Sequence, residues 1–124
     1  MMRDIREIVQ SALDAVFYGA VEVTLEELIA DEMPDEYITY TVVSGLYTEY
    51  ANNRPIRRRD YVDVKWRGLD IRKKNSRMEE IESAMRAAGF LPQDLPSDLY
   101  RDETSRYFGA MQEFALSREV PHGD

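Results

Sequence analysis

The side chains that most often act as catalytic bases and nucleophiles are nearly missing from this sequence. Its one histidine, His122, lies between Pro121 and Gly123 in the last residues of the chain. A general base or a metal-binding imidazole needs a partner that holds it in place, and a flexible tail does not supply one. The sequence contains no cysteine, which excludes disulfides, thiolate nucleophiles and cysteine-based zinc sites. We therefore expect no catalytic site of the Ser–His or Cys–His type.

Acidic side chains are the remaining candidates for chemistry. Asp31, Glu32, Asp35 and Glu36 stand close together in the sequence and could gather a hard cation. Their spacing lacks the Asp-x-Asp-x-Asp-Gly pattern of a calcium loop, so a solvated or partner-binding face is the better interpretation. No carboxylate pair stands out for glycoside chemistry, and neither GxxxxGK[ST] nor GxGxxG is present. The sequence predicts a protein that is not an enzyme, with no catalytic residue, metal ligand or cofactor.

The charge of the chain is divided between two segments. The formal net charge is −8 and the pI is near 4.7. The segment Arg54–Arg77 nevertheless holds ten Lys or Arg against three acidic residues, which makes it +7. The segment Glu22–Glu36 holds seven acidic residues and no basic one, which makes it −7. The chain is therefore polarised and not uniformly acidic.

One interpretation of the basic segment is a nucleic-acid patch. Three consecutive arginines lie in it near two aromatic residues, Tyr61 and Trp66, which could stack on bases. Trp66 alternates with the valines of "VDVKW", however, and this alternation predicts that it faces the core. The net negative charge would also repel a polyanion that extended beyond the patch.

Another interpretation uses both charged segments. If they lie on opposite sides of the domain, the acidic side chains of one copy can face the basic side chains of the next in a head-to-tail contact. Such contacts close into rings when the rotation between copies permits. The complementary charges would supply orientation and association rate more than affinity. The residues predicted to form this interface are Arg54, Arg57, Arg58, Arg59, Glu26, Glu27, Asp31, Glu32, Asp35 and Glu36.

The first half of the sequence predicts two helices and a strand. Apolar residues recur at helical spacing over Asp4–Val16. Thr24 and Glu27 match a capping box, which predicts a short second helix that ends at the next proline. The stretch "PDEYITYTVV", Pro34–Val43, has the aromatic and β-branched residues of a strand. The stretch that follows is expected to continue this strand and to form a long, exposed connection, with Gly45–Arg59 as a mobile loop.

The second half predicts strand, helix and strand. "RDYVDVKWRG" alternates between polar and apolar residues, as a strand with one buried face does. Ser76 and Glu79 match a second capping box, and the helix behind them is expected to end at Gly89. A short strand is expected near Asp98–Arg101. "SRYFGAMQEFALSR" predicts a closing strand, with a helix as the alternative for its second half. The face expected to be buried is Phe108, Ala110, Gln112, Phe114 and Leu116.

These elements predict an α+β fold. The expected architecture is a two-layer sandwich in which a small antiparallel sheet of three to four strands has two to three helices packed on one face. We expect one domain over residues 1–118 and a flexible C-terminal tail over residues 119–124. No apolar run approaches the roughly 18 residues of a membrane span, and the first residues lack the pattern of a secretory signal. We therefore expect a soluble protein that folds in the cytosol.

Four stretches of the sequence also occur in a familiar order. "PDEYITYTVVSG" follows an amphipathic helix and an acidic segment, and "EYANNRPIRRRDYVDVKWRG" comes directly after "SGLYT". "RMEEIESAMRAAGF" and "DLYRDETSRYFGAMQEFAL" complete the order. These stretches resemble the strands, the helix ending in Ala-Gly-Phe and the closing hairpin of the small tail-completion proteins of long-tailed bacteriophages and prophages. That family includes tail terminators and head–tail joining proteins. The resemblance spans nearly the whole chain.

The resemblance implies a function in virion assembly. Proteins of this family form rings, often hexameric, at the head-proximal end of the tail. The ring stops polymerisation of the tail tube and docks to the head connector. The implied partners are therefore further copies of the chain, the tail-tube protein and the connector protein, with no catalytic residue, cofactor or membrane involved. The implied location is the tail or neck of the virion, after assembly in the host cytoplasm. The alternative is a small nucleic-acid-associated phage regulator that uses the basic Arg54–Arg77 region.

Overall fold

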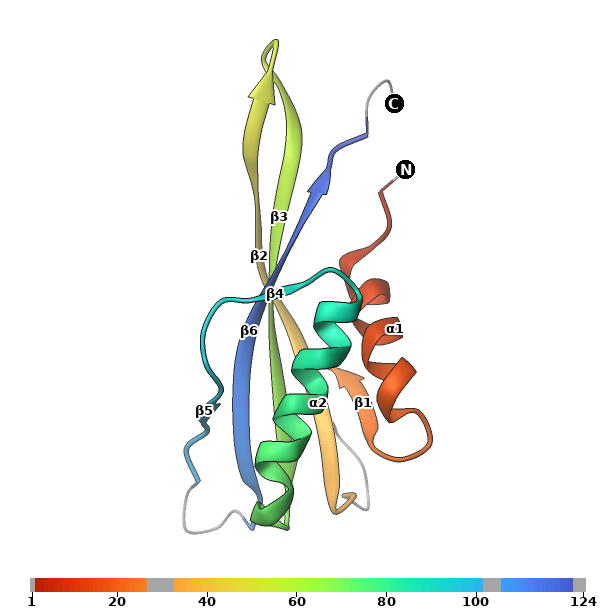
Figure 1. Cartoon of the computed structure of the whole chain (residues 1–124), viewed down its shortest axis with the longest axis vertical. Helices are drawn as coiled ribbons and strands as arrows, with labels where there is room; N and C mark the ends of the chain where they lie inside the picture. The colour runs from red at the N-terminus through yellow and green to blue at the C-terminus, as the bar shows by residue number, and fades with distance from the viewer. Residues whose placement is uncertain (1, 27–32, 102–105, 122–124) are drawn as a thin grey trace.

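The structure, a computed structural model, describes residues 2–26, 33–101 and 106–121. Its elements in chain order are α1 (Ile5–Phe17), β1 (Glu22–Leu25), β2 (Glu36–Ala51), β3 (Arg54–Gly68), the 3₁₀ helix η1 (Ile71–Lys73), α2 (Lys74–Ala87), β4 (Leu91–Pro92), β5 (Ser97–Asp98) and β6 (Phe108–Glu119). The strands form one sheet in the order β1-β2-β3-β6-β4, and β5 also pairs with β6. Both α-helices lie on the same side of this sheet (Figure 1).

The predicted fold class is wrong in the size and type of the sheet. The described residues contain six strands and two α-helices, where three to four strands and two to three helices were expected. The sheet is also mixed and not antiparallel, because β1 runs parallel to β2. The strands that the sequence did not predict are short. β1 and β4 contain too few residues to display the alternation from which strands are recognised.

Helix α1 forms as the sequence predicts. Asp4 caps it, because its side chain accepts a hydrogen bond from the backbone N–H of Arg6 at 2.8 Å. The apolar residues fall on one face of the helix, which is buried against β1, β2 and α2. That face consists of Ile5, Val9, Ala12, Leu13 and Phe17.

The segment after α1 is a strand and not the predicted short helix. Val23 and Leu25 of β1 pair in parallel with β2 and pack against the core. Thr24, the expected helix cap, lies inside this strand, and Glu26 then takes a left-handed φ of 65°. A capping box is a local signal, and the burial of apolar side chains against an existing strand outweighs it. The remainder of the predicted helix, residues 27–32, lies outside the described residues.

Strands β2 and β3 form one long antiparallel hairpin. Asn52 and Asn53 make its two-residue turn, with φ values of 52° and 63°. A tight hairpin turn of this kind requires positive φ at both central residues, which asparagine tolerates better than most residues. The expected continuation of the strand beyond Val43 is confirmed, since β2 extends to Ala51. The long mobile loop expected over Gly45–Arg59 is wrong, because the turn-forming residues mark only the tip of a hairpin.

The predicted closing strand is confirmed as β6. The alternative of a helix in the second half of this segment is wrong. Strand β6 pairs with β3 along its whole length, from Phe108 opposite Gly68 to Glu119 opposite Arg57. On the face expected to be buried, the residues from Ala110 onward are buried. β4 and β5 pair with the other edge of β6, and β5 is the short strand expected in this region.

Helix α2 ends as predicted but begins differently. Its N-cap residue is Lys73, which makes no side-chain capping bond, and Ser76 donates its hydroxyl to the Lys73 carbonyl at 3.1 Å. The second capping box is therefore wrong. Gly89 ends the helix with a φ of 96°, a conformation that glycine adopts readily. The helix packs on α1, β3 and β6 through Met78, Ile81, Ala84 and Met85.

Candidate interaction surface

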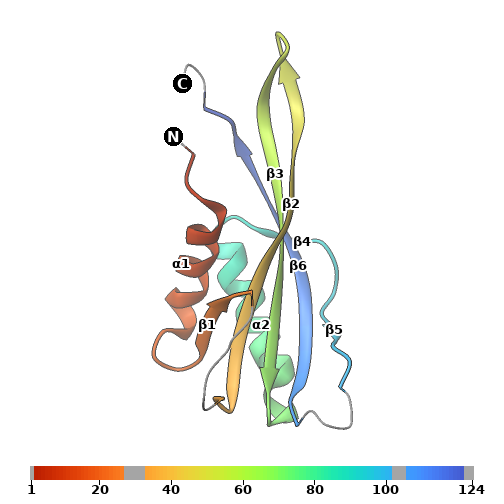
Figure 2. The ribbon, with the colours of Figure 1, turned by 180° about the vertical axis from the view of Figure 1, so that it is seen from behind.

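The distal half of the β2–β3 hairpin extends beyond the helices and the short strands (Figures 1 and 2). We refer to Val43–Arg59 as the hairpin arm. All its residues from Val43 to Arg54 are exposed. Leu46, Tyr47 and Tyr50 leave 47%, 48% and 61% of their surface uncovered, and the two tyrosine rings meet edge to face at 6.3 Å. Beyond Arg57 the arm is no longer paired with β6, and two-stranded hairpins are marginally stable in water. Exposed apolar side chains gathered on one segment mark sites of interaction.

A buried ion cluster joins the hairpin arm to the body of the protein. Asp60 is fully buried. Its two carboxylate oxygens accept from Arg58 and from Arg118 of β6, at 2.9 Å each. Arg118 also donates to the backbone carbonyl of Arg3, at 2.6 Å. Because charge-assisted hydrogen bonds hold the carboxylate from two sides, the cluster fixes the direction in which the arm leaves the sheet.

The four predicted interface arginines all lie on the arm but differ in their contacts. Arg58 is held by the buried cluster, where it shares the single carboxylate of Asp60 with Arg118. Arg57 Nη1 and Arg59 Nε lie 3.9 and 3.2 Å from oxygens of exposed β6 side chains, where ion pairs and hydrogen bonds contribute little. Arg54 is exposed beside the turn. Of the four arginines, only Arg58 therefore belongs to the buried cluster, and the other three carry their charge outside it.

The predicted acidic partners of these arginines are divided in the same way. Glu26 and Asp35 are exposed. Glu36 opens β2 at the end of the strand opposite the hairpin turn, and its carboxylate is bound inside the chain. The other three predicted residues, Glu27, Asp31 and Glu32, lie outside the described residues. Among the predicted acidic interface residues that the structure describes, Glu26 and Asp35 are therefore the two at the surface. Neither of them lies on the arm.

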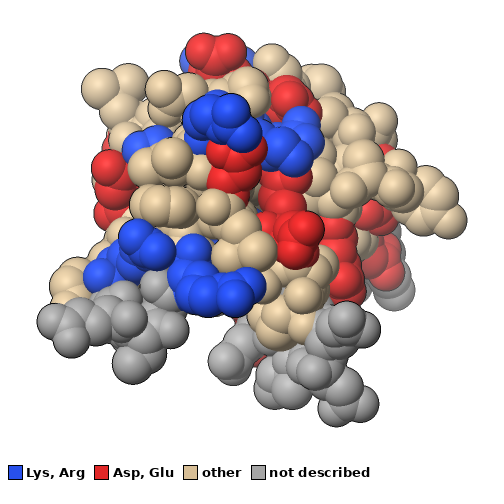
Figure 3. All heavy atoms as spheres, turned by 90° about the horizontal axis from the view of Figure 1, so that it is seen from below, with Lys and Arg blue, Asp and Glu red and all other residues tan. Residues whose placement is uncertain are grey.

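The basic segment Arg54–Arg77 is not one patch. β3 carries its first part at the arm and delivers the rest to the opposite end of the sheet. At that end, basic and acidic side chains are interspersed (Figure 3), and Arg72 and Lys74 form ion pairs with acidic residues. Trp66 is fully buried, which confirms the alternation and shows that its suggested stacking on bases is wrong. A nucleic-acid patch over the whole segment therefore loses its main aromatic platform.

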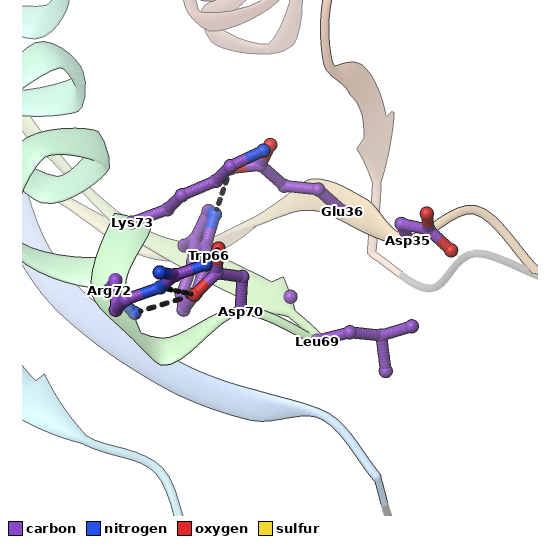
Figure 4. Close-up of a pocket in the computed structure, with 8 residues that line it drawn as sticks. Asp35, Glu36, Trp66, Leu69, Asp70, Arg72 and Lys73 are labelled. Atoms are coloured by element: carbon purple, nitrogen blue, oxygen red, sulfur yellow. Dashed lines mark hydrogen bonds and ion pairs between the residues drawn. The ribbon is translucent and has the colours of Figure 1, made fainter.

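A polar pocket of about 490 Å³ lies at this far end, between the start of β2 and η1 (Figure 4). Glu36 Oε2 accepts from Trp66 Nε1 at 2.7 Å and from Arg77 Nε at 2.6 Å. Burial raises the pKa of Glu36, but the hydrogen bonds from Arg77 and Trp66 together outweigh it and hold the pKa below its usual value. Hydrogen bonds from Arg72 likewise lower the pKa of Asp70. Both carboxylates are thus paired within the chain, which favours a structural role.

Two carboxylates lie opposite each other on the sheet face away from the helices, a third lies at the edge of β6, and no sequence pattern indicated this. Asp63 and Glu113 face each other across the β3–β6 ladder, and Asp94 accepts from the backbone N–H of Glu113 at 2.9 Å. Burial raises the pKa of Asp63, with Lys65 opposing and Asp94 adding to the shift. Burial, then the charges of Asp63 and Asp94, raises the pKa of Glu113. Within the described ranges, no group of His, Asp or Glu is arranged to hold a metal ion.

The apolar residues of the arm were not predicted as interface residues. Leu46, Tyr47 and Tyr50 were placed in a stretch expected to continue the strand and then form a mobile loop, and exposed apolar side chains have no fixed arrangement in such a loop. The signal that could have found them is Asn52-Asn53 between two runs of strand-forming residues, since an asparagine-rich dipeptide in that position is typical of a hairpin turn.

No protein-family model matches this chain, and no curated protein matches it. No helix in the described part of the chain is long and apolar enough to cross a membrane.

Proposed function

We propose that this chain is a non-enzymatic structural protein of a bacteriophage or prophage virion. In this proposal, copies of the chain assemble into a ring at the head-proximal end of a long tail. The ring completes the tail and joins it to the head connector. The sequence motifs supply the resemblance to tail-completion proteins, and the observation that carries the proposal is the hairpin arm.

The apolar side chains of the arm support a role in assembly. Leu46, Tyr47 and Tyr50 are about half exposed or more in the single chain, on a segment that no helix covers. Tyrosine offers a large apolar surface with a polar end at low entropic cost, which is why it is enriched in protein interfaces. Covering these side chains with a second protein would remove apolar surface from water and stabilise the arm.

The charge of the arm supports a copy of the same chain as that second protein. The arm holds four arginines and one acidic residue, whereas the whole chain has a net charge of −8. The body of another copy is therefore strongly acidic and attracts the arm. Charge complementarity of this kind steers association and weakens as salt is added.

Light scattering after size-exclusion chromatography, with negative-stain imaging, tests the proposal. The purified chain is expected to form rings of one size at low salt. Replacing both arm tyrosines, Tyr47→Ser with Tyr50→Ser, should shift the protein toward monomers. The matched control is Tyr18→Ser with Tyr100→Ser, because these side chains are 85% and 86% exposed but lie off the arm.

A wild-type protein that stays monomeric at high concentration and low salt would contradict the proposal. Rings that persist unchanged in the arm variant would contradict the use of the arm and leave the ring itself in place. Loss of rings in both double variants would show a general effect of removing exposed tyrosines, and would remove the support that the arm gives.

A further inference from the structure

Strand β2 has an outer edge that is only partly covered. β1 pairs with β2 over Tyr37–Tyr40, and the backbone N–H of Glu26 bonds to the Tyr40 carbonyl at 2.7 Å. Beyond that bond, no strand in the described part of the chain pairs with this edge. The backbone groups along it are therefore available to a strand from another chain.

Strand β6 has a similar edge on the other side of the sheet. β5 covers it at Ala110–Met111 and β4 covers it at Phe114–Ala115. From Leu116 to Glu119, no strand among the described residues pairs with the outer edge, while the inner edge continues its ladder with β3. The sheet thus ends in two open edges, one on each side of β3.

The two open edges lie at the same level of the sheet. Gly45 of β2 and Leu116 of β6 both pair with Asp60 of β3. In the next row, Leu46 and Ser117 both pair with Arg59. A third row, formed by Tyr47, Arg58 and Arg118, follows in the same register. Here the sheet is three strands wide, and another strand can be added on either side.

The open edge of β2 lacks the features that usually protect an edge strand. Proteins blunt such edges with charged residues, proline or bulges. Register shifts occur on either side of the stretch Ser44–Tyr47, between Val42 and Ser44 and between Tyr47 and Glu49. Within the stretch itself, the pairing with β3 is regular. That stretch contains no charge and no proline, and its Leu46 and Tyr47 side chains are exposed. The unprotected part of the edge therefore coincides with exposed apolar side chains.

We propose that the β2 edge at Ser44–Tyr47 of one copy pairs with the β6 edge at Leu116–Glu119 of the next copy. This inference rests on the proposed ring and identifies the strands that join its subunits. The two edges are different, so the contact is head-to-tail. An open row of subunits would keep a free β2 edge at one end and a free β6 edge at the other. Closure of a ring satisfies both remaining edges.

The orientation of the new strand pair follows from the topology. β2 and β6 are both antiparallel to β3, so they run in the same direction within one copy. Rotation about a ring axis preserves the direction of each strand along that axis. The β2 strand of one copy and the β6 strand of its neighbour are therefore parallel. A two-fold dimer would instead join two β2 edges in antiparallel fashion.

Cysteine cross-linking tests this pairing, because the chain has no cysteine of its own. The double variant Leu46→Cys with Ser117→Cys places one thiol on each open edge. Within one copy these positions are two strand spacings apart, about 10 Å, which is too far for a disulfide. Mild oxidation can therefore link them only between copies. A second double variant, Leu46→Cys with Glu119→Cys, covers a register shifted by two residues on the same face.

The expected result is a reducible ladder of covalent multimers that stops at the ring size in one of the double variants, with only monomer in each single variant. Covalent dimers of the Leu46→Cys single variant without a ladder in either double variant would show a two-fold contact and overturn the inference. Oligomers in light scattering without any cross-linked ladder would overturn the inference and leave the proposed ring intact. A strict monomer would overturn both.

A charge on the open edge gives a second measurement. Leu46→Lys places a cation on the outer edge of β2, a common protection against edge pairing. We expect it to convert assembled protein to monomer at low salt. The matched control, Leu95→Lys, makes the same change at a leucine that is 84% exposed and lies outside every strand. Assembly that survives Leu46→Lys as well as it survives Leu95→Lys would overturn the pairing of these edges.

Discussion

Gly45 and Asp60 face each other across the β2–β3 ladder, and a Cβ atom at Gly45 would lie 2.6 Å from Asp60 Oδ1. The same Cβ would lie 2.8 Å from the Arg58 guanidinium. The glycine is therefore required for space and not for a left-handed backbone. Its missing side chain leaves room for the buried carboxylate that ties the hairpin arm to β6.

The first prediction is that Gly45→Ala destabilises the protein. In an open strand this change would be neutral or favourable, since glycine is a poor strand former. Here the new methyl group displaces a carboxylate that two arginines hold in a buried site. We expect a loss of about 1–3 kcal/mol in the free energy of unfolding, the usual cost of overpacking. Urea denaturation measures it.

Ser44→Ala serves as the control for Gly45→Ala, because Ser44 is the exposed neighbour on the same strand. It should leave the denaturation midpoint nearly unchanged. A Gly45→Ala variant as stable as the wild type would show that the Asp60 cluster moves aside at no cost, and that it does not fix the arm.

The second prediction concerns the charge of the same cluster. Asp60→Asn removes the carboxylate but leaves Arg58 and Arg118 beside the site. Removing one partner of a buried ion pair leaves uncompensated charge, which typically costs about 3–5 kcal/mol. We expect a loss near the lower end of that range, because asparagine can still accept one hydrogen bond. Thermal and urea unfolding measure it.

The control for Asp60→Asn is Asp98→Asn, which makes the same chemical change at an exposed carboxylate that pairs with Lys74. Surface pairs of this kind contribute little to stability, so the midpoint should barely move. Equal effects of the two substitutions would contradict the special role of the buried carboxylate. Hydrogen exchange can add a local test, since faster exchange confined to the arm would show that the cluster holds it.

The sequence predicts the elements that bury a regular face and fails where the fold depends on register. α1, α2, the body of β3 and β6 all show periodic apolar residues, and each was predicted within a few residues of its observed bounds. β1 carries only Val23 and Leu25 as apolar contacts, and a capping box at Thr24 suggested a helix instead. Pairing with β2 decided its structure, and such a contact is not encoded locally.

The candidate site shows the same limit. Charge counting selected four arginines as interface residues, which stays a prediction, and it could not distinguish Arg58 from its neighbours. Arg58 differs because it lies on the same face of β3 as Asp60, two residues away, and next to Arg118 of a distant strand. The meeting of Asp63 with Glu113 depends in the same way on the β3–β6 register. Neither arrangement can be read from composition or spacing.

The third prediction is an acid-dependent loss of stability through Glu36. Because the pKa of Glu36 is lowered in the folded protein, its contribution is complete above the ordinary glutamate pKa and is lost as the pH falls through the lowered value. Glu36→Gln should cost about 1–3 kcal/mol at neutral pH, since Trp66 and Arg77 lose a charged acceptor. The difference between variant and wild type should shrink below about pH 4.

Unfolding by urea at a series of pH values measures the Glu36 effect. Glu79→Gln, at an exposed position of α2, gives the matched control and should be nearly neutral at every pH. A cost for Glu36→Gln that stayed constant into the acid range would point to altered packing around Trp66. It would contradict an effect of the carboxylate charge.

The fourth prediction has the opposite sign, because Glu113 has a raised pKa and faces Asp63. Like charges directly opposite each other on neighbouring strands are destabilising, by up to about 1 kcal/mol. Glu113→Gln should therefore raise the free energy of unfolding by about 0.5 kcal/mol at pH 7. A raised pKa favours the folded state in acid, so this advantage should disappear below about pH 4, where both states are protonated. A variant less stable than the wild type at pH 7 would show that the Glu113 carboxylate has a favourable partner that outweighs Asp63.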